Sequence, residues 1–217
     1  MGKGTKEKIR QTFDYNGSFY YYSQKAFDIL LVSVYWILGS LLVVTAGAAS
    51  AALYYTVIKS VRGDSSSVTE SFWHSFKDSL RQGIPHGLLT FGLLFLFLWN
   101  YGIIHAKMDG NAGIGFSMLY LLLAFAVLSA ACWVFPLLSR YRMPFGWYTK
   151  AALFSLFRYF PRTILLVAIH AAGYYLVYRW LPTILFVPGT VSLLGSFFAE
   201  KVVSRYAAED KTKEAVK

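Results

Sequence analysis

The chain has 217 residues, of which 56% are hydrophobic and only 15% are charged, and its formal net charge is +10. A soluble domain carries about 25% charged residues, so this composition excludes an ordinary soluble enzyme and indicates an all-α, polytopic membrane protein. The positive charge does not indicate nucleic-acid binding, because no basic soluble domain carries it; an excess of Lys and Arg in cytoplasmic loops is the commoner cause.

The chain begins with a basic, aromatic segment, residues 1–27, which we expect at the cytoplasmic face of the membrane. An apolar run follows within residues 28–62, and it is interrupted in its middle by the polar, small-residue sequence Thr45-Ala46-Gly47. One ordinary span needs about 20 residues, so this run is too long for one span and short for two. We expect the chain to turn back at the interruption and to form a broken first hairpin.

The distribution of basic residues favours that hairpin. With it, the chain crosses the membrane six times and places 19 of its 21 Lys and Arg residues on one side, leaving only Lys107 and Arg179 on the other. A single crossing gives five spans and a split of 14 to 7. Because cytoplasmic loops are enriched in Lys and Arg, we predict six short-to-normal spans arranged as three hairpins, with five spans as the alternative. Both termini are then cytoplasmic in a bacterial cytoplasmic membrane.

Small residues follow the interruption, and they predict close packing of this helix against its neighbours. Without a hydrophobic drive between helices in lipid, small side chains that let backbones approach are the main packing device. The expected helix-packing residues are Ala46, Gly47, Ala48, Ser50, Ala51 and Ala52. The alternative is a broken helix beside a buried binding site, as transporters use.

The second unit covers residues 63–139. Its first part, residues 71–83, is basic and aromatic, which predicts a helix lying in the membrane interface. Apolar runs at 84–104 and 116–138 predict the two spans of the second hairpin. Between them, the glycine-rich sequence at 110–115 has neither a preceding strand nor a Walker lysine, so we expect an external turn there.

The third unit, residues 140–200, repeats this organisation. Residues 146–162 predict a second interfacial helix, residues 163–178 and 183–198 predict the third hairpin, and residues 201–217 form a charged cytoplasmic tail. Across the two interfacial helices, the residues expected at the membrane interface are Trp73, Lys77, Arg81, Trp147, Lys150 and Arg158.

The polar residues do not predict an enzyme. No acidic residue falls in the middle of a predicted span, so there is no paired acid and base, and the histidines show no metal-binding spacing. We therefore expect no cofactor and no metal. The candidate substrate-binding residues are polar groups within the spans, Thr45, Asn100 and His170, whose alternative role is hydrogen bonding between helices.

Two blocks of sequence resemble a known family. SLLVVTAGAASAALYY (Ser40–Tyr55) and FWHSFKDSLRQ (Phe72–Gln82) are similar to the YesL family of integral membrane proteins from Gram-positive bacteria, although Leu42 stands where that family usually has proline. The resemblance implies a multi-pass membrane protein linked to carbohydrate ABC importers, with permease subunits and the lipid bilayer as partners. It brings no catalytic residues.

These observations lead to two functional hypotheses. The first is a non-enzymatic accessory subunit for carbohydrate or oligosaccharide import. It is not itself an ATPase-docking permease, because residues 150–161 begin like a coupling helix but carry Lys150 in place of glutamate and have no glycine. The second is a small stand-alone carrier or channel, in which Thr45, Asn100 and His170 line a cavity.

Overall fold

The computed structural model describes residues 18–63, 66–108 and 110–215, and these residues are helical throughout apart from short connections. In chain order the α-helices are α2 (Ser18–Ser40), α3 (Ala46–Thr56), α4 (Val68–Lys107), α5 (Gly110–Arg140), α6 (Phe145–Arg158), α7 (Phe160–Arg179) and α8 (Val187–Ala215). Three short segments supplement them: η1 (Val43–Thr45), the π-helical η2 (Val57–Arg62) and η3 (Leu181–Leu185). The predicted all-α fold is therefore confirmed.

Three of the described helices, α4, α5 and α7, are long and apolar enough to cross a membrane. This finding supports membrane association, whereas the number of crossings remains a prediction. Of the predicted terminal segments, residues 1–17 lie outside the described residues, and residues 201–215 continue α8 as one helix.

The first hairpin is formed by α2 and α3, which pack antiparallel. Near the turn, Trp36 Nε1 donates a hydrogen bond to Ser50 Oγ at 3.2 Å, while farther from it Val32 and Val57 share one buried cluster. The chain thus doubles back within residues 28–62. The turn lies slightly earlier than predicted, because residues 46 and 47 already belong to α3.

The side chain of Thr45 explains why the turn falls there. Its Oγ1 donates to the carbonyl oxygen of Gly39 at 2.7 Å and lies 2.8 Å from that of Leu42. The last carbonyls of a helix have no partner within the helix, so this hydroxyl satisfies the end of α2 and leaves the chain free to reverse. Ala46 can then begin α3.

The α3–α4 crossing depends on glycine. A Cβ atom added at Gly47 would lie 2.2 Å from the Gly83 carbonyl oxygen and 2.7 Å from Gly87 Cα. A Cβ atom added at Gly83 would in turn lie 2.6 Å from the Cα atom of Ala48, which follows Gly47 in α3. The two backbones therefore touch directly, and the residues of α4 that permit this form a G-x-x-x-G sequence, a packing motif of membrane helices.

Helix α4 is a single 40-residue helix, which differs from the expected separate interfacial helix at 71–83. Ser67 is its N-cap residue, and the Ser67 Oγ accepts a hydrogen bond from the Glu70 N–H. Pro85 lies inside the helix. The inner half packs on the first hairpin, where Phe72 and Ser79 are buried. This half is held by protein contacts, and the helix continues without a break into the following apolar half.

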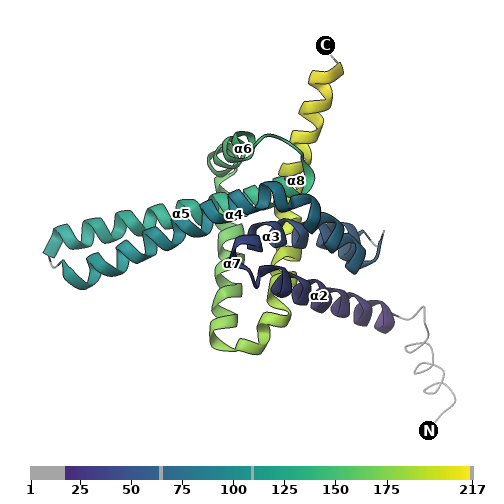
Figure 1. Ribbon diagram of the computed structural model, residues 1–217, viewed down its shortest axis with the longest axis horizontal. Helices are drawn as coiled ribbons and strands as arrows, with labels where there is room; N and C mark the ends of the chain where they lie inside the picture. The colour runs from purple at the N-terminus through teal and green to yellow at the C-terminus, as the bar shows by residue number, and fades with distance from the viewer. Residues whose placement is uncertain (1–17, 64–65, 109, 216–217) are drawn as a thin grey trace, which may run out of the picture.

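The outer halves of α4 and α5 form an antiparallel pair that projects away from the rest of the molecule (Figure 1). We call residues 92–107 and 110–123 the arm. Residues 110–115 belong to α5 rather than to an external turn, and only two residues separate the helices. Gly110 has a φ of +81°, a conformation that glycine adopts without strain, so the reversal is completed in very few residues.

Helix α6 is a separate short helix, as the sequence predicted, and it packs beside α5. Its buried face includes Tyr148, whose hydroxyl donates to the Tyr141 carbonyl at 2.5 Å and accepts from the Met143 N–H at 2.9 Å. Burial raises the pKa of the Tyr148 hydroxyl. On the other face, Phe154 and Phe157 are 58% and 76% exposed, so this helix presents aromatic side chains outward, as an interfacial helix does.

A large buried cluster joins α3, α5, α6, α7 and α8. At its centre Trp133 is fully buried, and its Nε1 donates to Thr163 Oγ1 at 3.0 Å. Helices α7 and α8 form the third hairpin through η3, and α7 runs steeply across the α4–α5 pair (Figure 1). The three hairpins therefore meet around a common centre.

Candidate binding cavity

A cavity of about 450 Å³ lies where the three hairpins meet, and it is lined by residues of α2, η1, α3, α4, α5, α7, η3 and α8. We call it the central cavity. Most of its lining is aliphatic or aromatic, and no Lys, Arg, Asp or Glu belongs to it. Its volume is within the roughly 300–1,000 Å³ of small-molecule sites. The polar lining residues are Trp36, Ser40, Ser50, Tyr54, Thr90, Cys132, His170, Tyr174 and Ser192.

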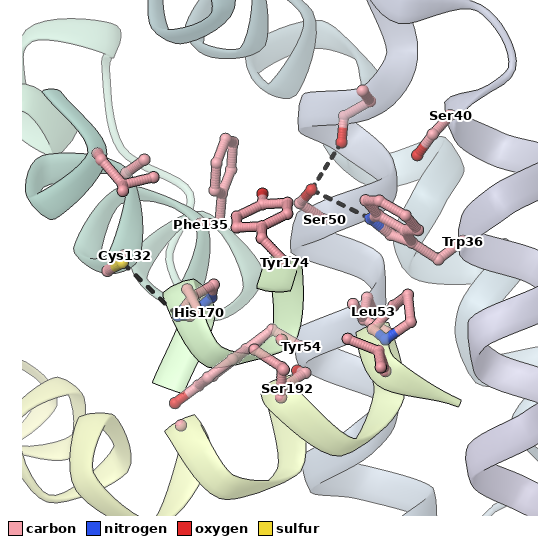
Figure 2. Close-up of a pocket in the computed structure, with 18 of the residues that line it drawn as sticks. Trp36, Ser40, Ser50, Leu53, Tyr54, Cys132, Phe135, His170, Tyr174 and Ser192 are labelled. Atoms are coloured by element: carbon pink, nitrogen blue, oxygen red, sulfur yellow. Dashed lines mark hydrogen bonds between the residues drawn. The ribbon is translucent and has the colours of Figure 1, made fainter. Parts of the chain in front are cut away.

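Some of these polar groups already have partners. Ser50 Oγ accepts the hydrogen bond from Trp36 Nε1 at 3.2 Å and donates to the Ala46 carbonyl at 2.8 Å (Figure 2). Tyr54 points its hydroxyl toward Glu200 Oε2 at 3.5 Å, and Glu200 is also paired with Arg140 just outside the lining. These groups hold the helices around the cavity together and leave little for a ligand.

His170 keeps one nitrogen available. Its Nδ1 lies 2.8 Å from the Leu166 carbonyl oxygen, and a carbonyl can only accept, so Nδ1 carries the proton. The neutral ring therefore has an acceptor at Nε2, for which the described residues provide no hydrogen-bond partner. Cys132 Sγ lies 3.8 Å from the same Nδ1 atom (Figure 2).

Two serine hydroxyls of the lining are buried without a partner. Neither Ser40 Oγ nor Ser192 Oγ has a hydrogen bond to any described residue, and Ser192 is only 9% exposed. Leaving a buried hydroxyl unpaired costs about 1–3 kcal/mol. Such groups in an apolar cavity are therefore the natural contact points for a bound molecule.

Part of the cavity lining belongs to residues that are exposed at the protein surface. Two of its lining residues are largely exposed, Val43 at 66% and Tyr174 at 62%. Both present apolar surface, and the neighbouring α7 residues Tyr175 and Leu176 are exposed as well. The exposed side chains of this part of the lining and of the adjoining turn of α7 are therefore mainly apolar.

The titratable side chains of the lining are one imidazole, one thiol and two phenols, with no carboxylate. Among the described residues, no group of three His, Cys, Asp or Glu side chains is placed to hold a metal ion.

The structure separates the three predicted substrate-binding residues. His170 lies in the cavity lining. Thr45 does not line it and bonds instead within the first turn. Asn100 lies on the arm, where its Nδ2 donates to the Leu96 carbonyl at 2.8 Å. Ser40 and Ser192 were not predicted from the sequence. A serine hydroxyl in a membrane helix usually bonds to the backbone of its own helix, and no local sequence signal identifies the serines whose hydroxyl is left unpaired.

The predicted interface residues fall in two groups. Trp73, Lys77 and Arg81 are exposed on the inner half of α4, and Lys150 and Arg158 are exposed on α6. Trp147 is instead half-buried, with its ring 5.5 Å from that of Tyr141 and 6.0 Å from that of Tyr206. Its side chain therefore joins α6 to neighbouring segments.

The predicted packing residues Ala46, Gly47, Ala48, Ala51 and Ala52 are buried in α3, and Ser50 is half-buried beside Trp36.

Comparison with known proteins finds a match to part of the chain. Residues 29–101 match a family model described as "Protein of unknown function, DUF624". The matched stretch contains the first hairpin and most of α4, including the glycines of the α3–α4 crossing. No curated protein and no solved structure matches the chain.

Proposed function

We propose that the protein is a non-enzymatic accessory subunit of a carbohydrate importer, and that the arm packs against the membrane helices of a permease subunit. The observation that supports this proposal most is the glycine content of the arm. A Cβ atom added at Gly92, Gly102 or Gly115 would meet nothing within 4 Å. Small residues in membrane helices mark places where another helix approaches closely, and this chain supplies no such helix among its described residues.

The exposure of the arm agrees with a partner surface. In the most apolar 18-residue window of α4 only 11% of the residues are buried, against 50% for α5. Phe95, Trp99 and Leu122 are each at least 60% exposed. The link to carbohydrate import comes from the resemblance to the YesL-like proteins, which belong to the DUF624 group matched over residues 29–101.

We expect arm variants to lose the permease. A tagged chain is produced together with the permease subunits encoded by its own organism and is extracted in mild detergent. Gly102→Leu should reduce the co-purified permease about tenfold, the change produced by about 1.4 kcal/mol. The control is Gly146→Leu on α6, where an added Cβ also meets nothing within 4 Å, and it should retain the permease.

Two outcomes would reject this surface. The first is a wild-type chain that recovers no permease under these conditions. The second is equal recovery by the Gly102→Leu and Gly146→Leu variants, because it would show that the arm makes no contact that a larger side chain disturbs.

We further propose six crossings, with both ends of the chain in the cytoplasm. Three exposed positions test this topology in a Cys132→Ala background: Tyr22, Lys107 and Lys150. A membrane-impermeant maleimide added to intact cells should label Lys107→Cys and should not label Tyr22→Cys or Lys150→Cys until the membrane is opened. Labelling of Tyr22→Cys in intact cells would instead place the start of α2 outside and favour five crossings.

The second candidate function is a small stand-alone carrier or channel, and the central cavity favours it. The cavity is not suited to an oligosaccharide, because most of its lining cannot form hydrogen bonds. Uptake by proteoliposomes that contain this chain alone, compared with empty liposomes, distinguishes a carrier from an accessory subunit.

A further inference from the structure

We infer that the central cavity is a binding site for an uncharged amphiphile from the membrane, of the long-chain alcohol class, with its hydroxyl held by Ser192 and His170. This inference goes beyond the proposed function, which concerns the arm. It stands on the shape, the lining and the unpaired polar groups of the cavity.

The lining determines the body of the ligand. Side chains such as Leu53, Phe135 and Val191 bound the space, and Figure 2 shows Phe135, Tyr174 and Trp36 around its upper part. A cavity of about 450 Å³ with this lining gains from being filled by hydrocarbon, because each wall atom facing empty space lacks its dispersion contacts.

The unpaired polar groups determine the headgroup. His170 Nε2 can only accept a hydrogen bond, whereas each of the two serine hydroxyls can donate and accept. A ligand hydroxyl can therefore donate to His170 and accept from Ser192. This satisfies the Ser192 hydroxyl, which has no hydrogen-bond partner among the described residues.

The same lining excludes charged headgroups and sugars. A phosphate, carboxylate or ammonium group would have no opposite charge among the lining residues, and an unpaired charge in an apolar site is strongly unfavourable. An oligosaccharide would bring many more hydroxyl groups than the free polar atoms can satisfy. The exposed lining residues Val43 and Tyr174 are mainly apolar, which suits a ligand that arrives from lipid.

Photolabelling tests this site in the full-length protein. The chain is placed in lipid nanodiscs and irradiated with hexadecanol that carries a diazirine on its chain, and the labelled peptides are mapped. We expect the label on α5 and α7 near Cys132 and His170. Excess hexadecanol should compete, whereas hexadecyl phosphate and maltose should not. Label spread over the arm, without competition by hexadecanol, would show an adventitious additive only, and competition by hexadecyl phosphate would reject the neutral headgroup.

Matched variants test the polar contacts. Ser192→Ala and His170→Phe should each weaken competition by hexadecanol about fivefold, the value for one neutral hydrogen bond. Ser117→Ala is the control, because Ser117 is also a buried, unpartnered serine but does not line the cavity. Equal affinity of the Ser192→Ala, His170→Phe and Ser117→Ala proteins would reject the assigned contacts. If a variant fails to fold, the wild-type label map and its competition pattern still decide whether the site exists.

Discussion

Replacing Gly47 with alanine should destabilise the protein by about 3 kcal/mol, the upper part of the range for overpacked sites. The new methyl group would lie 2.2 Å from the Gly83 carbonyl oxygen and 2.9 Å from the Gly87 nitrogen. Both are backbone atoms of α4, so no side-chain rotation can relieve the contact. The whole helix would have to move away from α3, and the wall of the central cavity would move with it.

The buried thiol of Cys132, the only cysteine in the chain, reports this loss directly. The protein is heated in detergent with a maleimide that becomes fluorescent when it reacts with the thiol. The midpoint temperature of the rise in fluorescence is recorded. The matched control is Gly92→Ala on the same α4, where the added Cβ meets nothing within 4 Å. It should be neutral or stabilised by up to about 1 kcal/mol through helix propensity. Equal midpoints for the two variants would contradict the described crossing.

Replacing Trp133 with alanine should have a similarly large effect, also about 3 kcal/mol. Trp→Ala changes in cores cost about 3–5 kcal/mol, and the lower value applies because the unfolded chain remains in lipid rather than water. Trp133 is fully buried and donates to Thr163 Oγ1 at 3.0 Å. Alanine therefore leaves a cavity between α5 and α7 and removes one hydrogen bond of the Thr163 hydroxyl, which still donates to the Tyr159 carbonyl oxygen at 3.2 Å.

Two further variants separate these contributions. Trp133→Phe keeps most of the ring and should lose only the hydrogen bond, about 0.6 kcal/mol in a membrane protein. Trp99→Ala removes a side chain that is 60% exposed on the arm and should change stability by less than about 0.5 kcal/mol. The measurement is the fraction of protein that still elutes as a single species after heating. A Trp133→Ala protein as heat-resistant as Trp99→Ala would show that this core contributes little.

The small residues of α3 could be recognised from the sequence, but their partner could not. A run of Ala and Gly in an apolar segment predicts that a helix packs closely, whatever it packs against. The partner sequence, Gly83 to Gly87 on α4, was visible as G-x-x-x-G, yet it lies where a basic segment changes to an apolar one. That change in polarity suggested a boundary between two helices, so the G-x-x-x-G sequence was not recognised as a packing motif within one helix.

The continuity of α4 shows why polarity alone does not locate helix ends. Backbone groups inside a membrane protein must be satisfied internally, so a helix continues until its chain geometry stops it. Pro85 removes one N–H but does not end α4. For the same reason residues 110–115 are helical although three of them are glycine.

The cavity was beyond sequence reasoning for a different reason. Its lining residues are drawn from helices throughout the chain, from Trp36 to Ala199, so no local pattern contains it. His170 was identified because a polar ring in the middle of an apolar span is conspicuous. Thr45 was equally conspicuous, but its hydroxyl is used within its own turn. Only the packing of the helices distinguishes these two cases.

The steep crossing of α7 over the α4–α5 pair has a consequence for the surrounding lipid. A flat hydrocarbon layer is about 30 Å thick, and two hairpins that cross steeply cannot both stand upright in it. At least one must lie obliquely, so the apolar girdle of the protein does not form a level ring. In the six-crossing topology proposed above, lipid molecules beside α7 must tilt or shorten to cover the exposed Tyr178 side chain, and we expect the bilayer next to the protein to be thinned by this hydrophobic mismatch.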